Sequence, residues 1–199
     1  MSVPACGRTL RVAAIVLAAG EGRRFGEAGK LLSPFRGRPL ASHAVDAALA
    51  SRASPVVVVT GHRGAELQRS LSGRAVRWVH NEGYRAGLSG SLRVGLSALS
   101  QEAEAALICL GDMPHVQAAH LDLLIDAFSA TAGSKICAPF WSGRRGNPVL
   151  WPARHFASLG ALTGDRGARD LLDALADQVL PVAMPDDAVL YDVDTPADA

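Results

Sequence analysis

Residues 12–32, "VAAIVLAAGEGRRFGEAGKLL", join a short apolar run to a loop that is rich in glycine and positive charge. The run lacks alternating polar positions, which is typical of a strand covered on both faces in a parallel sheet. The loop contains four glycines, two adjacent arginines and a lysine. Glycine lets a backbone approach a ligand closely, and basic side chains attract an anion. The stretch therefore predicts the first strand of a parallel sheet, followed by an anion-binding loop at its carboxyl end.

The rest of the chain alternates apolar runs with segments of helical periodicity. We expect strands over residues 12–17, 55–60, 75–79, 105–110 and 135–139. We expect helices, from apolar positions that recur every three or four residues, over 39–51, 64–72, 89–100, 117–130 and 164–176, the last capped by Asp165. Such alternation indicates βαβ crossovers, so the predicted fold is α/β, a single Rossmann-like domain with a doubly wound, mainly parallel sheet. The Gly- and Pro-rich residues 138–153 are expected to be irregular and to lie over an active site.

The composition argues against several classes of function. Twenty Lys and Arg residues are balanced by 19 Asp and Glu residues, and the formal net charge of +1 predicts no bulk attraction to nucleic acid or to an anionic membrane. Cys6, Cys109 and Cys137 are scattered without metal-ligand spacing, which favours reduced thiols in a cytoplasmic protein. The first residues superficially resemble a secretory signal, but cleavage after Ala19 would sever the glycine loop from its strand.

Two common nucleotide-binding motifs do not fit the glycine loop. A dinucleotide fingerprint starting at Gly20 would need glycine at position 25, where the chain has Phe25. A Walker loop ending at Lys30 would need glycine and a hydroxyl residue where the chain has Arg24 and Leu31. We therefore expect the loop to bind a polyphosphate without a P-loop, through glycine backbone and the charges of Arg24 and Lys30. The alternative is a glycine-rich turn with solvated basic side chains.

Two acidic positions are candidate metal ligands. Asp112 follows the apolar run 105–110, so its carboxylate should emerge at the carboxyl edge of the sheet near the glycine loop. Mg²⁺ prefers oxygen ligands and is usually held by one or two carboxylates together with phosphate oxygens, which Asp112 could supply. Near the end of the chain, Asp194 is the stronger candidate for a second ligand and Asp192 the weaker. The alternative is that Asp112 and Asp194 cap a helix or turn.

Four motifs follow one another along the chain: "LAAGEGRRFGEAGKLL" at 17–32, "LGDMP" at 110–114, "RGNPVL" at 145–150 and "DVDTPAD" at 192–198. They resemble, in this order, the signature loop, the metal-binding segment, the acceptor-side segment and the closing motif of the MobA-like NTP transferases, which include the molybdenum cofactor guanylyl- and cytidylyltransferases. The resemblance implies one MobA-like domain over residues 1–199, with the fold of the nucleotide-diphospho-sugar transferases. It also implies transfer of a nucleotide from an NTP to a phosphate-bearing acceptor, with release of pyrophosphate.

Within this family the chain is most similar to the cytidylyltransferases that act on molybdopterin, because of "GLSGSLRVGL" at 87–96 and "GDRGARDLL" at 164–172. This likeness implies CTP as the donor, Mg²⁺ as the cofactor, a molybdopterin-type acceptor, and delivery of the product to a molybdoenzyme or its chaperone. The alternatives are guanylyl transfer to the molybdenum cofactor and cytidylyl transfer to a sugar or methylerythritol phosphate. In another class, the chain would be a nucleotide- or flavin-binding relative without transferase activity.

The resemblance also implies roles for individual residues. The expected catalytic residues are Arg24, Lys30 and Asp112, and the expected metal ligands are Asp112 and Asp194. The expected nucleotide-binding residues are Leu17, Ala18, Ala19, Gly20, Gly22, Arg24, Lys30, Asn81, Gly87 and Ser89. On the acceptor side we expect Arg145 and Asn147, although many cytidylyltransferase-like relatives would have histidine where this chain has Asn147. Ser89 could instead cap a helix, and Arg145 could simply be solvated.

Overall fold

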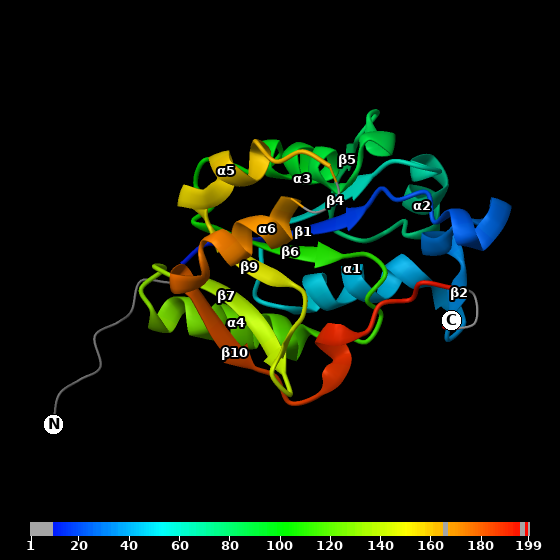
Figure 1. Ribbon diagram of the computed structural model, residues 1–199. Helices are drawn as coiled ribbons and strands as arrows, with labels where there is room; N and C mark the ends of the chain where they lie inside the picture. The colour runs from blue at the N-terminus through cyan, green and yellow to red at the C-terminus, as the bar shows by residue number, and fades with distance from the viewer. Residues whose placement is uncertain (1–9, 165–166, 196–197, 199) are drawn as a thin grey trace, which may run out of the picture.

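The structure is a computed structural model, and it describes residues 10–164, 167–195 and 198 of the chain. A central sheet of eight strands has the order β10-β7-β9-β6-β1-β4-β5, with β8 paired to β7 (Figure 1). Its strands are β1 (Val12–Ala18), β4 (Val56–Thr60), β5 (Arg77–His80), β6 (Ala105–Leu110), β7 (Ile136–Trp141), β8 (Arg144–Arg145), β9 (Val149–Pro152) and β10 (Val179–Ala183). A separate small hairpin is formed by β2 (Pro34–Phe35) and β3 (Arg38–Pro39).

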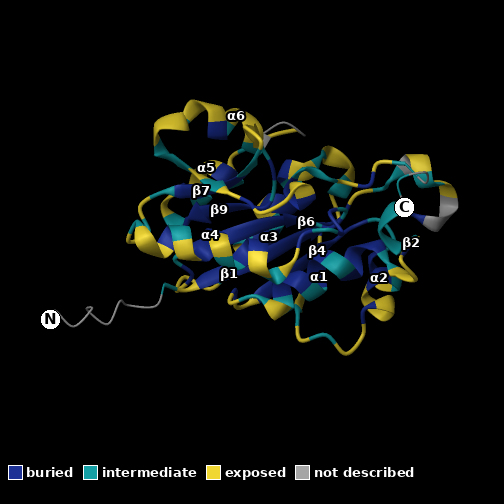
Figure 2. Ribbon diagram, turned by 90° about the horizontal axis from the view of Figure 1, so that it is seen from below, coloured by how far each residue is buried: buried dark blue, intermediate teal, exposed yellow. Residues whose placement is uncertain are grey.

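Helices cover both faces of the sheet. They are α1 (Leu40–Ala50), α2 (Gly64–Ser70), α3 (Leu88–Ser97), α4 (Ala118–Ala130), α5 (Phe156–Gly160) and α6 (Gly167–Ala174). The 3₁₀ turns are η1 (Arg23–Ala28), η2 (Lys30–Leu32), η3 (Tyr84–Ala86), η4 (Ala153–His155), η5 (Ala176–Gln178) and η6 (Asp187–Leu190). One core cluster packs α1, α2 and α4 against one face, and a second packs α3, α5 and α6 against the other. In Figure 2 the strands are accordingly buried between helices whose outer sides are exposed. None of the described helices is long and apolar enough to cross a membrane.

Strand β1 shows why its sequence lacks alternation. All seven residues are buried, with Ala14 and Val16 in one core cluster and Ile15 and Leu17 in the other. The strand is parallel to both neighbours, β4 and β6. Because helices cover both faces of the sheet, β1 needs apolar side chains on both of its faces, as expected for a strand of a parallel sheet between helical layers. The prediction of a doubly wound, mainly parallel α/β fold is confirmed.

The prediction that residues 138–153 are irregular was wrong. Residues 138–153 are not irregular: they complete β7, form a hairpin with β8 and enter the sheet as β9. Strand β9 lies between β6 and β7 and is antiparallel to both, and β8 is antiparallel to β7. The other four strand pairings of this sheet are parallel. Strand β10 was not predicted, and β5 begins at Arg77 rather than at residue 75. The predicted cap Asp165 lies outside the described residues.

Candidate active site

The candidate site lies where three parallel strands end side by side. The glycine loop follows β1, Gly61 follows β4, and Asp112 follows β6 by two residues. Because β1 pairs in parallel with both other strands, their carboxyl ends share one edge of the sheet. The backbone N–H of Gly111 donates to the carbonyl of Leu17 at 3.0 Å, which ties the start of the Asp112 turn to the end of β1. The adjacent strand order thus brings the glycine loop and Asp112 together.

A cavity of about 470 Å³ opens at this edge. Its lining residues are Leu17, Ala19, Gly20, Glu21, Gly22, Lys30, Leu31, Tyr84, Arg85, Gly87, Leu88, Ser91, Leu110 and Asp112. The size is within the usual range for small-molecule sites, which bury most of a ligand in an apolar cleft with a few convergent polar groups. Of the predicted nucleotide-binding residues, the structure brings six to the lining: Leu17, Ala19, Gly20, Gly22, Lys30 and Gly87.

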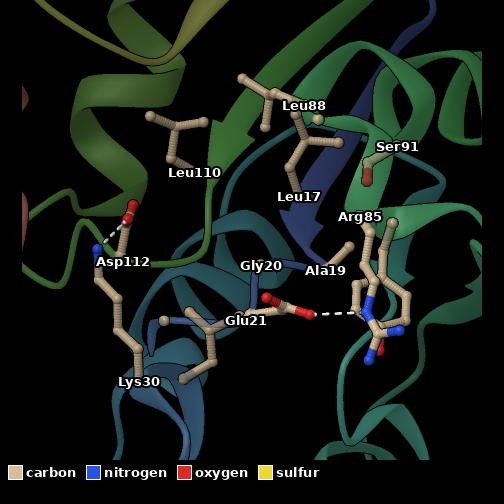
Figure 3. A pocket seen from close by; sticks show the side chains of 14 residues that line it. Leu17, Ala19, Gly20, Glu21, Lys30, Arg85, Leu88, Ser91, Leu110 and Asp112 are labelled. Atoms are coloured by element: carbon tan, nitrogen blue, oxygen red, sulfur yellow. Dashed lines mark hydrogen bonds and ion pairs between the residues drawn. The ribbon is translucent and has the colours of Figure 1, made fainter. Parts of the chain in front are cut away.

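Lys30 contacts both predicted metal ligands at one side of the cavity, and Figure 3 shows its contact with Asp112. Its Nζ donates to Asp112 Oδ2 at 2.6 Å and to Asp194 Oδ1 at 3.3 Å. The Lys30 side chain is only 12% exposed, against 25% for Asp112 and 58% for Asp194. Arg24 lies further out, with Nη1 4.0 Å from Asp194 Oδ2 and a side chain that is 71% exposed. Lys30 is therefore the inner cation of the site and Arg24 the outer one.

A backbone hydrogen bond positions Asp194 beside Asp112 and Lys30. The N–H of Val193 donates to the carbonyl of Asp112 at 3.0 Å, so the closing motif runs beside the Asp112 turn. The carboxylate that accepts local backbone N–H groups is that of Asp198, which binds the N–H groups of Asp194 and Thr195 and the hydroxyl of Thr195. The Asp194 carboxylate accepts from Lys30, and the alternative that it caps a terminal helix concerns residues that lie outside the described part of the chain.

Asp112 does not cap a helix, since α4 begins at Ala118 after Gln117, but it does lie in a turn, at residues 111–112. Asp192, the weaker candidate, shares the electrostatic environment of the two other carboxylates. Burial raises its pKa above the usual range, and the negative charges of Asp194 and Asp112 raise it further. This crowding of acidic groups places negative potential where a cation would be held.

The residues present fit a divalent cation that is shared with a phosphate. Two carboxylate oxygens, one from Asp112 and one from Asp194, approach a single positive centre, which here is the Lys30 ammonium. Mg²⁺ is commonly held by one or two carboxylates while phosphate oxygens and water complete its shell. Among the described residues, no group of three His, Cys, Asp or Glu side chains could hold a metal alone.

On the opposite wall, a buried polar pair supports the turn before α3. The Asn81 amide donates from Nδ2 to Ser91 Oγ at 3.0 Å and accepts the Gly83 N–H at 3.0 Å through Oδ1. Asn81 thus lies behind the cavity, and Ser91 lines it. Ser89 is buried outside the lining, and its N–H donates to the Gly164 carbonyl. The alternative of Ser89 as a helix cap is wrong, because α3 begins at Leu88 after Gly87 and has no side-chain cap.

Sequence reasoning missed an ion pair at the far side of the cavity. Glu21 Oε1 and Arg85 Nε are 2.9 Å apart, and both residues line the cavity (Figure 3). The Arg85 guanidinium also lies 5.5 Å from the centre of the Tyr84 ring. The pair links the glycine loop to η3 across 64 positions of sequence. Its only signal in the sequence was the opposite charge of two residues in separate glycine-rich loops.

The predicted acceptor-side residues lie outside the described cavity lining. Arg145 Nη2 donates to Asp173 Oδ1 at 2.8 Å, and the Asn147 N–H donates to the Val189 carbonyl at 2.9 Å. Ala18 and Arg24 also lie outside the lining. Ala18 is buried in the core between the sheet and α1, whereas Arg24 is exposed beside Asp194.

Comparison with known proteins agrees with this geometry. The model of the family described as MobA-like NTP transferase domain matches residues 14–179. The protein Rv0371c of Mycobacterium tuberculosis is similar in structure, with a TM-score of 0.84, 27% identity and 96% of each chain covered. It has also been solved in complex with manganese. A nucleotidyl transferase from Methanothermobacter has a TM-score of 0.79, with 25% identity over 94% of each chain.

Similarity to curated proteins extends over a shorter stretch. The bifunctional protein GlmU of Burkholderia orbicola is 35% identical over 114 residues, which is 57% of this chain. The matched stretch covers 25% of the GlmU sequence, so the chain spans about a quarter of the length of the curated relatives it matches.

Proposed function

Because the chain belongs to the family of MobA-like NTP transferase domains, we propose that it is a Mg²⁺-dependent enzyme that transfers CMP from CTP to a molybdopterin-type acceptor and releases pyrophosphate. Nucleotidyl transfer is the general activity indicated by the name of this family and by that of the similar protein from Methanothermobacter. The proposal adds the donor base, the metal and the acceptor. We also propose that residues 1–199 act as one domain and that the reaction takes place in the cytoplasm.

One observation carries the proposal. Lys30, Asp112 and Asp194 meet at the side of a cavity whose floor is the glycine loop. In phosphoryl and nucleotidyl transfer the protein mainly positions the reactants and stabilises charge, so no side-chain nucleophile is needed. A site made of backbone amides, two basic side chains and two carboxylates suits this chemistry.

Each group has a separate task in the proposed reaction. The loop backbone at Gly20 and Gly22 lies open to the cavity, where it would approach the phosphates closely. Lys30 and Arg24 would stabilise the negative charge on the phosphates and on the leaving pyrophosphate. Asp112 and Asp194 would hold Mg²⁺, which neutralises phosphate charge when bound so that an anionic acceptor can approach. The manganese complex of the similar Rv0371c supports a divalent metal.

The proposed base site is the wall formed by η3 and the start of α3. Gly87 and Ser91 line the cavity there, and Figure 3 shows Ser91 on the side away from Asp112 and Lys30. Because Ser91 Oγ accepts a hydrogen bond from Asn81, its own hydroxyl proton is free to donate to a ring acceptor of the base. The preference for cytosine rests on the resemblance of residues 87–96 to the cytidylyltransferases.

The acceptor part of the proposal rests on the motif "RGNPVL". Arg145 would bind the phosphate of a molybdopterin-type acceptor, which would require it to leave or share its contact with Asp173. Asn147 stands where many relatives would have histidine, and we propose that it donates to the acceptor. A molybdoenzyme or its chaperone would then receive the product.

A thermal-shift series with CTP, GTP, ATP and UTP, each with Mg²⁺, tests the donor. A ligand at about 100 times its Kd adds about 2.7 kcal/mol of stability, so CTP should raise the Tm most. Pyrophosphate release from CTP with molybdopterin then tests the acceptor. A larger shift in Tm and faster turnover with GTP than with CTP would show that the enzyme transfers a guanylyl group instead. A yellow purified protein without nucleotide-dependent turnover would contradict the transferase proposal.

A further inference from the structure

The position of Lys30 raises a question about the metal site. Its ammonium lies between the two carboxylates that the proposed function assigns to the metal, at 2.6 Å from Asp112 and 3.3 Å from Asp194. A divalent cation that used the same two oxygens would have to approach this ammonium closely. Like charges at such a distance repel strongly in a site that is only partly solvated. The ammonium and the metal therefore compete for these oxygens.

We propose that Lys30 is the resident counter-ion of Asp112 and Asp194 in the nucleotide-free enzyme, and that it leaves them for the nucleotide phosphates as the metal enters. This inference rests on the proposed function, since it concerns the same carboxylates and the same nucleotide. It predicts an order of binding: the metal occupies the site together with the nucleotide and not before it. It assigns Lys30 a positioning role in the free enzyme in addition to its role at the phosphates.

The geometry allows Lys30 to make this exchange. Its Cβ lies against Gly22, a glycine with a φ of 57° that lines the cavity, so the side chain starts beside the proposed phosphate site. Its backbone is held in η2, where the Ser33 N–H donates to the Lys30 carbonyl. Rotation about the outer side-chain bonds would then carry Nζ from the carboxylates towards phosphates bound beside Gly22. An ammonium on a flexible four-carbon chain suits such a movement better than a planar guanidinium.

Charge balance gives a reason for the exchange to be coupled to the nucleotide. Without a ligand, removal of Lys30 would leave two carboxylates facing each other, and Arg24 is too exposed and too far at 4.0 Å to replace it. A triphosphate brings negative charges that bind the ammonium, and a divalent cation can then neutralise the carboxylates. Metal alone offers Lys30 no new partner, so wild-type protein should bind it weakly.

The first test measures binding of Mn²⁺ to the protein without nucleotide. Electron paramagnetic resonance gives the concentrations of free and bound Mn²⁺. Lys30→Met removes the charge and keeps a similar length of side chain, and Lys135→Met is the matched control. Lys135 is the only other lysine in the chain, and its Nζ contacts the Asp177 carbonyl on the surface. We expect Lys30→Met to bind one Mn²⁺ at least about tenfold more tightly than wild type, because a competing positive charge is gone. Lys135→Met should bind Mn²⁺ as wild type does.

The second test follows Lys30 directly in the wild-type protein. Because the chain has two lysines, ¹⁵N,¹³C-lysine labelling gives two side-chain signals, and Lys135 serves as the internal reference. The Lys30 signal should stay in place with Mg²⁺ alone and shift when CTP and Mg²⁺ are added together. This measurement does not depend on whether Lys30→Met folds.

Several results would overturn the inference. Equal Mn²⁺ affinity in wild type and Lys30→Met would show that Lys30 does not compete with the metal. Absence of Mn²⁺ binding to a folded Lys30→Met protein would show that the freed carboxylates are not a metal site. A Lys30 signal that shifts fully with Mg²⁺ alone would contradict the order of binding. Failure of the proposed function is distinguishable, because the Mn²⁺ comparison needs neither nucleotide nor acceptor.

Discussion

Replacement of Asp112 by Asn tests whether the charge of this carboxylate is needed for catalysis. The change keeps the size of the side chain and one acceptor oxygen, so Lys30 Nζ, now 2.6 Å from Oδ2, can still donate a hydrogen bond. What disappears is one of the two negative charges that the proposal assigns to Mg²⁺. The fold should therefore survive while turnover that depends on the metal falls.

The size of each effect follows from the contacts. A hydrogen bond between charged groups contributes about 1.5–3 kcal/mol and a neutral one roughly half as much, so the variant should lose about 1 kcal/mol of stability. In a chain of this size that lowers the Tm by about 2–4 °C. Loss of one preorganised electrostatic group typically costs about 10²- to 10³-fold in rate. The effect on kcat should thus far exceed any effect of unfolding at 25 °C.

The assay is pyrophosphate release from CTP and the acceptor as a function of Mg²⁺ concentration, with thermal unfolding measured in parallel. Asp122→Asn is the matched control, because Asp122 on α4 also accepts a hydrogen bond, from the Arg52 N–H at 2.9 Å, and does not line the cavity. Asp194→Asn should cost less than Asp112→Asn, since Asp194 is more exposed and further from Lys30. An unchanged rate and Mg²⁺ dependence in Asp112→Asn would refute the mechanism.

Three further changes have defined outcomes. Arg24→Ala should lower kcat by about 10²-fold with little change in Tm, because the side chain is exposed; full turnover at saturating CTP would make it structural only. Gly95→Ala should cost about 1–3 kcal/mol in chemical unfolding, because its Cβ would lie 2.6 Å from Ile15 Cγ2; an unchanged midpoint would contradict this packing. Arg74 holds the pKa of Asp46 below its usual value of 3.8, so the carboxylate stabilises the fold above that pH. Asp46→Asn should therefore lose about 0.5–1 kcal/mol at pH 7, a difference that closes as the pH falls below 3.8; a constant difference would argue against the ion pair.

The first half of the fold could be predicted because its signals are local. A run such as 105–110 is buried on both faces, and burial on both faces removes the alternation of polar residues from the sequence itself. Helices such as α1 and α4 show their apolar stripe within one or two turns. Strand β9 gave no such signal, because its four residues follow Pro148 directly and end on Pro152 within a glycine-rich segment. Its place between β6 and β7 depends on pairing with strands far away in the sequence.

The sequence by itself determined the elements of the site: a glycine loop after the first strand, Lys30 within it, and an acidic residue after a buried strand. Strand order in a parallel sheet then required the loop and Asp112 to share an edge if their strands were neighbours. Only the tertiary structure decided which acidic side chain near the end of the chain joined them. Asp194 reaches Lys30 across 164 positions because Val193 binds the Asp112 carbonyl, and the contact between Glu21 and Arg85 depends in the same way on how two loops fold back. Periodicity reports what one segment buries, whereas a contact between distant segments depends on the path of all the chain between them.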